Sequence, residues 1–315
     1  MSDRFDFLEF GDTTPHQASA TADPDTAVAD IESGAPAGLD TSWKPTRLRA
    51  VEIIGEPGTG HGQFSNPTGL AVDRFGAVYV ADSNNHRVQR IGMNGELKVY
   101  GRPGSAPGEI WGPTAVAVDP SGDFFYVAEQ GNQRVQCFQI NGQHRGVMNG
   151  FRSPTGIAVD IAGRLWIADT GNRRVLYWDG RNRVYGTPLD ESVGVARPVS
   201  VACDANHTLY ITEGVVEDII FYRNYSLKTG SLGANRRLHA PQQVAIDAQG
   251  RIYVAESGAD RLHVFSPEGE SIVTFDTLSK RMGSLKSPSG VALGPNGEVY
   301  VADTHNHRVV HLAWE

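Results

Sequence analysis

The chain has 315 residues, of which 40% are hydrophobic, and this fraction is enough for a sizeable buried core. No stretch approaches the roughly 20 apolar residues of a membrane helix, and the first residues have neither the basic nor the apolar region of a secretory signal. The net charge is −8. The two cysteines lack metal-ligand spacing, so we expect them to be small buried residues. With so few cysteines and no membrane segment, we expect a cytoplasmic protein without a membrane partner.

The first 46 residues, called the tail here, hold nine acids and two bases, a net charge of −7. Residues 11–43 have almost no large apolar side chains and cannot offset the entropy of ordering, so we predict a disordered acidic tail over residues 1–46. Near its start, large apolar residues are interleaved with acids. We interpret them as a short docking motif for a partner or for the rest of the chain: Phe5, Phe7, Leu8 and Phe10.

After the tail, one sequence unit recurs six times. Its clearest copies are residues 64–73, 151–160 and 285–293, and it contains a proline at positions 67, 113, 154, 198, 241 and 288. Each proline is followed by runs of branched and aromatic residues between Gly, Asp and Asn turns, a pattern typical of strands. The prolines are 41 to 47 residues apart, the length of a four-stranded blade. We therefore predict an all-β, six-bladed propeller of four-stranded antiparallel blades.

The consensus P-x-G-[IVL]-A-V-D, followed by Y-V-A-D-x-x-N-x-R-V, resembles the NHL repeat family over roughly residues 48–315. The resemblance implies the same six-bladed fold and a wide top face that is offered to other proteins.

The ring must also close. Residues 48–55 precede the first repeat at the spacing of a fourth strand, and the last repeat stops after its third strand. We expect residues 48–55 to complete the sixth blade, which removes two exposed strand edges. The expected division is a tail over residues 1–46 and a monomeric propeller over residues 47–315.

Five repeats place an acid five residues before an arginine, at the turn from the second to the third strand. We predict a charge-assisted bond that pins each of these turns. The pairs are Asp82 and Arg87, Glu129 and Arg134, Asp169 and Arg174, Glu256 and Arg261, and Asp303 and Arg308. In the fourth repeat Val216 and Asp218 stand where Asn and Arg are expected, either through drift or because this blade holds a site.

The residue after each repeat proline is expected at the inner end of the top face, which also carries the turns with the acid and arginine pairs. We predict that the six residues form the mouth of the channel, a polar binding surface with few ionisable groups: Thr68, Thr114, Thr155, Val199, Gln242 and Ser289.

Three histidines, His86, His305 and His307, lie on the turns of the first and last repeats. Two blades supply them and no third blade contributes, so we interpret them as surface turn residues rather than metal ligands. We expect no catalytic residue, no metal and no cofactor.

The sequence favours a non-enzymatic interaction scaffold or ligand-binding module whose protein partner contacts the top face, the tail motif or both. Two alternatives stay open. One is a propeller hydrolase or lyase, such as a lactonase, with a metal in the central channel. The other is single-stranded RNA binding on the top face, although acids and bases outside the tail nearly cancel, at 27 and 26.

Overall fold

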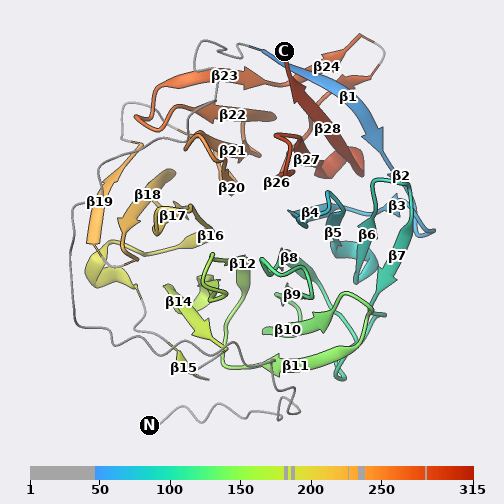
Figure 1. Ribbon diagram of the computed structural model, residues 1–315, viewed down its shortest axis with the longest axis horizontal. Helices are drawn as coiled ribbons and strands as arrows, with labels where there is room; N and C mark the ends of the chain where they lie inside the picture. Colours follow the sequence, from blue (N-terminus) through green and yellow to red (C-terminus); the bar gives the residue numbers. More distant parts are fainter. Residues whose placement is uncertain (1–46, 181–183, 186–188, 226, 233–237, 281) are drawn as a thin grey trace, which may run out of the picture.

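The computed structural model describes residues 47–180, 184–185, 189–225, 227–232, 238–280 and 282–315. The tail and its predicted docking motif, Phe5, Phe7, Leu8 and Phe10, lie outside the described residues. Within them, six four-stranded antiparallel sheets surround a central channel (Figure 1). This arrangement confirms the all-β, six-bladed propeller that the sequence predicts. No helix in this part of the chain has the length and apolar character needed to cross a membrane.

Each blade begins beside the channel and ends at the rim. Blades one to three comprise β4 (Pro67–Val72), β5 (Val78–Asp82), β6 (Arg87–Ile91) and β7 (Leu97–Tyr100); β8 (Pro113–Val118), β9 (Phe124–Glu129), β10 (Arg134–Gln139) and β11 (His144–Met148); and β12 (Pro154–Val159), β13 (Leu165–Asp169), β14 (Arg174–Asp179) and β15 (Val184–Tyr185). Blades four to six comprise β16 (Pro198–Cys203), β17 (Thr208–Glu213), β18 (Asp218–Arg223) and β19 (Leu227–Ser231); β20 (Pro241–Ile246), β21 (Ile252–Glu256), β22 (Arg261–Phe265) and β23 (Ser271–Phe275); and β26 (Gly290–Leu293), β27 (Val299–Asp303), β28 (Arg308–Trp314) and β1 (Leu48–Ile54).

The loops contain small elements. Strand β2 (Glu56–Pro57) pairs with β3 (Gln63–Phe64), and β24 (Thr277–Ser279) pairs with β25 (Gly283–Ser284). The 3-10 turns are η1 (Ser83–Asn85), η2 (Thr170–Asn172), η3 (Glu191–Val193) and η4 (Thr304–Asn306).

Blade six is built from both ends of the repeat region. Strand β1 pairs antiparallel with β28, with Leu48 opposite Trp314. The indole Nε1 of Trp314 donates to the hydroxyl of Tyr253 in blade five at 2.9 Å, which ties this blade to its neighbour. Blade six packs against blade one through a shared cluster of buried side chains, so the ring is closed (Figure 1).

The hydrophobic core lies between the blades. Among the described residues, six clusters of buried side chains are present, and each cluster spans one pair of adjacent blades, including the pair of blades six and one. The second strand of a blade contributes to both of its interfaces because successive side chains point to opposite faces of the sheet. In β5, for example, Tyr79 packs toward blade two, whereas Val78 and Val80 pack toward blade six.

The glycine of the repeat motif lets the inner strands approach one another. A Cβ atom added to Gly69 would lie 2.5 Å from the Cα atom of Ala115 in blade two. A Cβ atom on Gly156 would similarly lie 2.6 Å from the Cα atom of Ser200 in blade four. Neighbouring backbones therefore occupy the space that a larger residue would need.

We call the face that carries the proline loops and the turns between second and third strands the top face. The opposite face, which carries the loops between first and second strands, is the bottom face. The termini of β4 and β5 that hold Pro67 and Asp82 pair directly, and both lie at the top.

Candidate functional site

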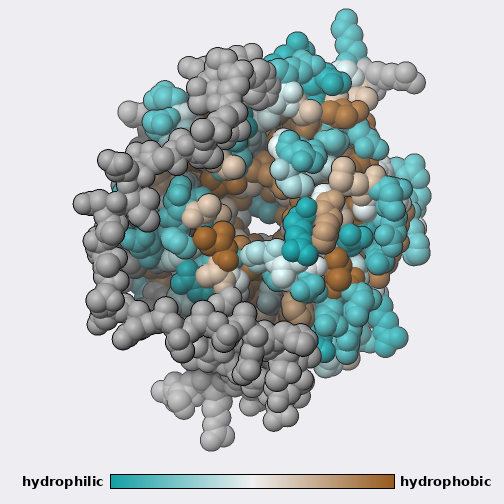
Figure 2. Space-filling model, viewed as in Figure 1, coloured by the Kyte–Doolittle hydropathy of each residue, from teal (hydrophilic) through white to brown (hydrophobic). Residues whose placement is uncertain are grey.

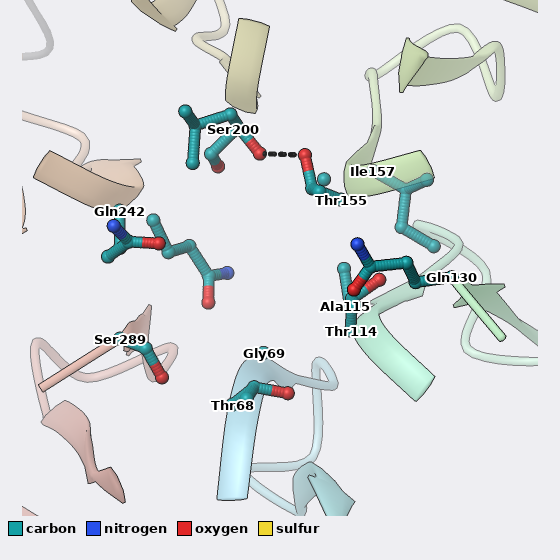
Figure 3. A pocket seen from close by; sticks show the side chains of 13 residues that line it. Thr68, Gly69, Thr114, Ala115, Gln130, Thr155, Ile157, Ser200, Gln242 and Ser289 are labelled. Carbon is teal, nitrogen blue, oxygen red and sulfur yellow. Dashed lines mark hydrogen bonds between the residues drawn. The ribbon is translucent and has the colours of Figure 1, made fainter. Parts of the chain in front are cut away.

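The six predicted mouth residues come together around one cavity of about 200 Å³ at the inner end of the top face (Figure 3). Gln130, Ser200 and Gln243 are among the other residues that line this cavity. Figure 2 shows the opening at the centre of the disc, with hydrophilic and hydrophobic residues side by side around it.

The hydroxyl groups at the mouth bond to the neighbouring blade. Thr68 Oγ1 lies 2.6 Å from Ser83 Oγ, and Ser83 donates to the carbonyl oxygen of Pro113 in blade two at 2.5 Å. Thr114 likewise donates to Pro154 O in blade three at 2.9 Å. The same arrangement recurs with Thr155 and Thr170, which donate to Val199 O and Pro198 O, and with Ser289 and Thr304, where Thr304 donates to Pro67 O.

These bonds give the mouth hydroxyls a structural task. Each bond to a proline or valine carbonyl oxygen joins one blade to the first strand of the next, and the donated hydroxyl hydrogens are used within the protein. A ligand at the mouth would therefore meet mainly acceptor lone pairs and side-chain amides.

The side chain of Gln243 connects blade five with blades one and six. Its side chain belongs to β20 of blade five, but Nε2 donates to Leu70 O at 2.8 Å and Oε1 accepts from Leu70 N at 3.0 Å. The same oxygen accepts from Val291 N of blade six at 3.3 Å. The equivalent residues of the other blades are Gly, Ala or Ser. The unusual size of Gln243 at this position is therefore the feature of the sequence that could have identified it.

The five acid and arginine pairs are ion pairs between second and third strands. In each pair the carboxylate side chain is fully buried, and the arginine Nε lies 2.7 to 3.0 Å from a carboxylate oxygen. In blade one the guanidinium of Arg87 also donates to the carbonyl oxygens of Thr59, Gly60 and Gln63. The pair thus holds both its own turn and the loop that leads into the blade.

In blade four, the buried carboxylate at the end of the second strand is stabilised without an arginine. The carboxylate of Glu213 accepts the backbone N–H groups of Ala196, Arg197 and Val215 at 2.9 to 3.0 Å. Three donors satisfy the buried group, so neither the Asn nor the Arg of the other blades is needed. The turn that follows presents Val215 and Val216, each 62% exposed.

The residue before the turn arginine forms a contact between blades. His86 and His307 adopt left-handed backbone conformations with φ of 55° and 56°. Their Nδ1 atoms accept the N–H groups of Gly112 and Asn66, which immediately precede the proline of the next blade. Glu217 and Asp260 occupy the same position and accept from Ala240 and Ser287.

These histidines therefore have structural partners, a role that sequence reasoning missed because it depends on the next blade. His305 is exposed on the turn of blade six. Within the described ranges, no group of three or more His, Cys, Asp or Glu side chains is placed to hold a metal ion.

Burial and hydrogen bonding shift the pKa values of Glu256 and of the two cysteines. Burial alone would raise the pKa of Glu256, but hydrogen bonds from His263, Arg261 and the backbone of His239 outweigh it, and the pKa is lowered. Burial raises the pKa of the Cys137 thiol to about 12 and raises that of Cys203 well above its ordinary value. Both thiols are free and, at neutral pH, protonated.

Six copies of one four-stranded unit around a channel define a β-propeller, and comparison with protein families identifies the unit. The model of the NHL repeat matches residues 64–91, 111–138, 151–176 and 285–312. These segments lie in blades one, two, three and six, the blades that keep the acid, Asn and Arg together. The chain thus carries NHL repeats in four blades of a six-bladed propeller, and the resemblance read from the sequence is confirmed.

Several curated proteins share this region. The B-box type zinc finger protein ncl-1 of Caenorhabditis elegans is 43% identical over 130 residues, which cover 40% of this chain and 15% of that protein. The human E3 ubiquitin-protein ligase TRIM32 is 25% identical over 294 residues, with coverages of 82% and 43%. Human NHL repeat-containing protein 2 is 24% identical over 300 residues, with coverages of 78% and 38%. The chain spans less than half the length of these relatives.

Solved structures share the fold at low identity. A streptogramin B lyase superposes with a TM-score of 0.60 at 13% identity, over 85% of this chain and 98% of the other. A gluconolactonase from Xanthomonas campestris superposes with a TM-score of 0.64 at 14% identity, over 87% and 99%. A chain of a nidogen and laminin complex gives 0.61 at 17% identity, over 74% and 87%. The likeness extends to the architecture alone.

Proposed function

We propose that this chain is a non-enzymatic NHL propeller that binds a protein partner on its top face. The observation that carries the proposal is Trp111, whose side chain lies on the top face and is 46% exposed. Large exposed aromatic side chains are frequent centres of binding energy in protein interfaces. The relatives that share the repeat support an interaction domain, but fold likeness by itself does not assign a function.

Trp111 is held in place before any partner arrives. Its indole stacks on the imidazole of His86 with ring centroids 3.9 Å apart and planes 17° from parallel. The His86 ring is in turn fixed by the N–H of Gly112, and the N–H of Trp111 donates to Glu129. A side chain that is already ordered loses little conformational entropy on binding, so its contact area contributes more to affinity.

The mouth supports the same assignment. Its hydroxyl groups join adjacent blades, and the remaining lining is made of amide, small and apolar side chains. Such a lining suits a hydrogen-bonded contact with a partner's loop better than acid and base catalysis.

The test is capture of partners from the native cell by the tagged full chain, in three forms. Trp111→Ser should weaken retention by about 2 kcal/mol, roughly 30-fold in Kd, if the indole is a central contact. Phe75→Ser is the matched control, because Phe75 is 59% exposed in a loop of the bottom face. Equal loss with both variants, or no loss with Trp111→Ser, would contradict the proposal.

Two further outcomes decide against it. If nuclease treatment of the extract abolishes top-face binding, the ligand is RNA rather than protein. If the purified chain retains a metal through dialysis and hydrolyses a lactone, the non-enzymatic half of the proposal is wrong.

A further inference from the structure

The sequence contains the dipeptide Asn-Gly four times, and all four asparagines are exposed. The pairs are Asn94 with Gly95, Asn141 with Gly142, Asn149 with Gly150, and Asn296 with Gly297. Glycine has no Cβ atom, so its backbone nitrogen can approach the side-chain amide of a preceding asparagine and displace ammonia from it. Because exposure and dipeptide are the same at the four pairs, the hydrogen bonds around each pair decide which of them reacts.

Three of the pairs lie in turns of the bottom face that bind the glycine nitrogen. In each turn the glycine N–H donates to a backbone carbonyl oxygen at 2.8 to 3.1 Å: Gly95 to Gly92, Gly142 to Gln139, and Gly297 to Gly294. A nitrogen held in this way must first break its hydrogen bond before it can attack the asparagine.

The asparagine side chains of these three turns are also engaged. Asn94 Oδ1 accepts the N–H of Glu96 at 3.0 Å, and Asn141 Oδ1 accepts that of Gln143 at 2.9 Å. Asn296 Nδ2 donates to Glu298 Oε1 at 3.0 Å. Such bonds from a side chain to its own turn fix the amide in place. The folded state therefore protects both reacting groups at each of these turns.

The fourth pair, Asn149 and Gly150, has neither form of protection. It follows β11 at the top face, on the loop that leads into blade three. Within the described ranges, neither the side-chain amide of Asn149 nor the N–H of Gly150 takes part in a hydrogen bond. The loop is held instead through the carbonyl oxygen of Gly150, which accepts from Arg174 Nη2 at 3.3 Å and from Asn172 Nδ2 at 3.5 Å.

We propose that Asn149 is a site of spontaneous deamidation in the folded chain, with water as the co-reactant. The Gly150 nitrogen gives up its proton and bonds to Asn149 Cγ, while the bond from Cγ to the side-chain nitrogen breaks and ammonia leaves. Water then opens the cyclic succinimide. Cleavage of the new bond to Cγ leaves an aspartate, and cleavage of the bond to the main-chain carbonyl carbon leaves an isoaspartate.

Both products change the top face. Each adds one negative charge beside the loop between blades two and three. The isoaspartate also lengthens the main chain by one carbon directly before Gly150, whose carbonyl oxygen bonds to Arg174 and Asn172. Deamidation therefore alters the charge of the face assigned to the partner and displaces a loop that the blade-three ion pair helps to hold. The reaction itself does not depend on the proposed function.

The experiment is incubation of the purified, folded full chain at neutral pH and physiological temperature, followed by digestion and mass spectrometry of the peptides with Asn-Gly. Asn94 is the matched internal control, because Met precedes both Asn94 and Asn149. We expect Asn149 to deamidate about ten times faster than Asn94, Asn141 or Asn296 in the folded chain. In concentrated urea, where the turn hydrogen bonds are lost, Asn149 and Asn94 should react at similar rates.

Three results would overturn the proposal. They are an unreacted Asn149 in the folded chain, a rate at Asn149 no higher than at Asn94, and an advantage of Asn149 that persists unchanged in urea. The last result would show that sequence rather than structure sets the order.

A pair of variants gives a second measurement. The longer side chain of Asn149→Gln requires a larger and less favourable ring, so this variant should form the more acidic species, followed by anion-exchange chromatography, about fourfold more slowly than the natural chain. Asn94→Gln should form it at nearly the natural rate, and equal rates in the two variants would contradict the assignment. Since no partner is present, failure here leaves the proposed function intact, and failed partner capture leaves the deamidation site intact.

Discussion

The side-chain amide of Gln243 is hydrogen-bonded to both backbone groups of Leu70, although the two residues belong to blades five and one and blade six lies between them. A third bond, to Val291 N, includes blade six in the same contact. One side chain thus joins three inner strands at the place where the ring closes.

Replacing Gln243 by Glu tests this contact. The carboxylate cannot donate to Leu70 O, so that carbonyl loses its partner and faces a negative charge. We expect the free energy of unfolding, measured by urea denaturation, to fall by about 1–3 kcal/mol. Gln249→Glu in an exposed bottom-face turn is the control. Equal stabilities of the two variants would show that Gln243 is dispensable for closure.

The repeat glycine provides a second prediction. Gly69→Ala would place a methyl group 2.5 Å from the Ala115 Cα atom and 2.7 Å from Thr114 O, so the inner strands must separate. Such overpacking costs about 1–3 kcal/mol. Gly230→Ala is the matched substitution in a strand, where the nearest atom is 3.8 Å from the new methyl group. Thermal unfolding should separate the two variants, and similar melting temperatures would argue against the close approach.

The buried ion pairs should contribute far more than surface pairs. Arg87→Met leaves the fully buried carboxylate of Asp82 without its guanidinium partner, which costs about 3–5 kcal/mol. Arg102 pairs with Glu109 while its own side chain is 80% exposed, so Arg102→Met should cost less than about 1 kcal/mol. Chemical denaturation of both variants measures the contrast, and comparable losses would refute it.

The lowered pKa of Glu256 predicts a pH dependence. A carboxyl group whose pKa is lower in the folded state stabilises the fold at pH values above its pKa in the unfolded chain, which is about 4.3. This contribution is lost as the pH falls through the pKa of the folded state. Glu256→Gln should therefore be destabilising at neutral pH, and the difference from the natural chain should shrink in acid. Urea denaturation at about pH 7 and about pH 3 provides the comparison. A difference that is constant with pH would contradict the linkage.

Much of the fold could be predicted because the same pattern occurs six times, and each copy supports the others. The mouth could also be located, since Thr68 and its five counterparts follow equivalent prolines and equivalent positions of a ring converge on its axis. What their hydroxyl groups do could not be predicted. Whether Ser83 donates to Pro113 depends on the distance and register between two blades, which a single repeat does not specify.

Blade four illustrates the other limit. The sequence shows that Asn and Arg are missing from this turn. It does not show that backbone N–H groups take their place, because nearly every residue type carries such a group. The three N–H groups around Glu213 become visible only when the loop from Ala196 is folded beside the turn. The exposed valines, in contrast, could be read from the sequence once the turn had been placed on the surface.

The pairing of β1 with β28 has a consequence for synthesis of the chain. Strand β1 emerges from the ribosome before any complete blade, yet its partner is made only after the other five blades. Until then, β1 and β4 each expose a surface that belongs to a later part of the ring. We expect nascent chains to hold five formed blades in an open arc, which closes in a single late step once residues 308–314 are available.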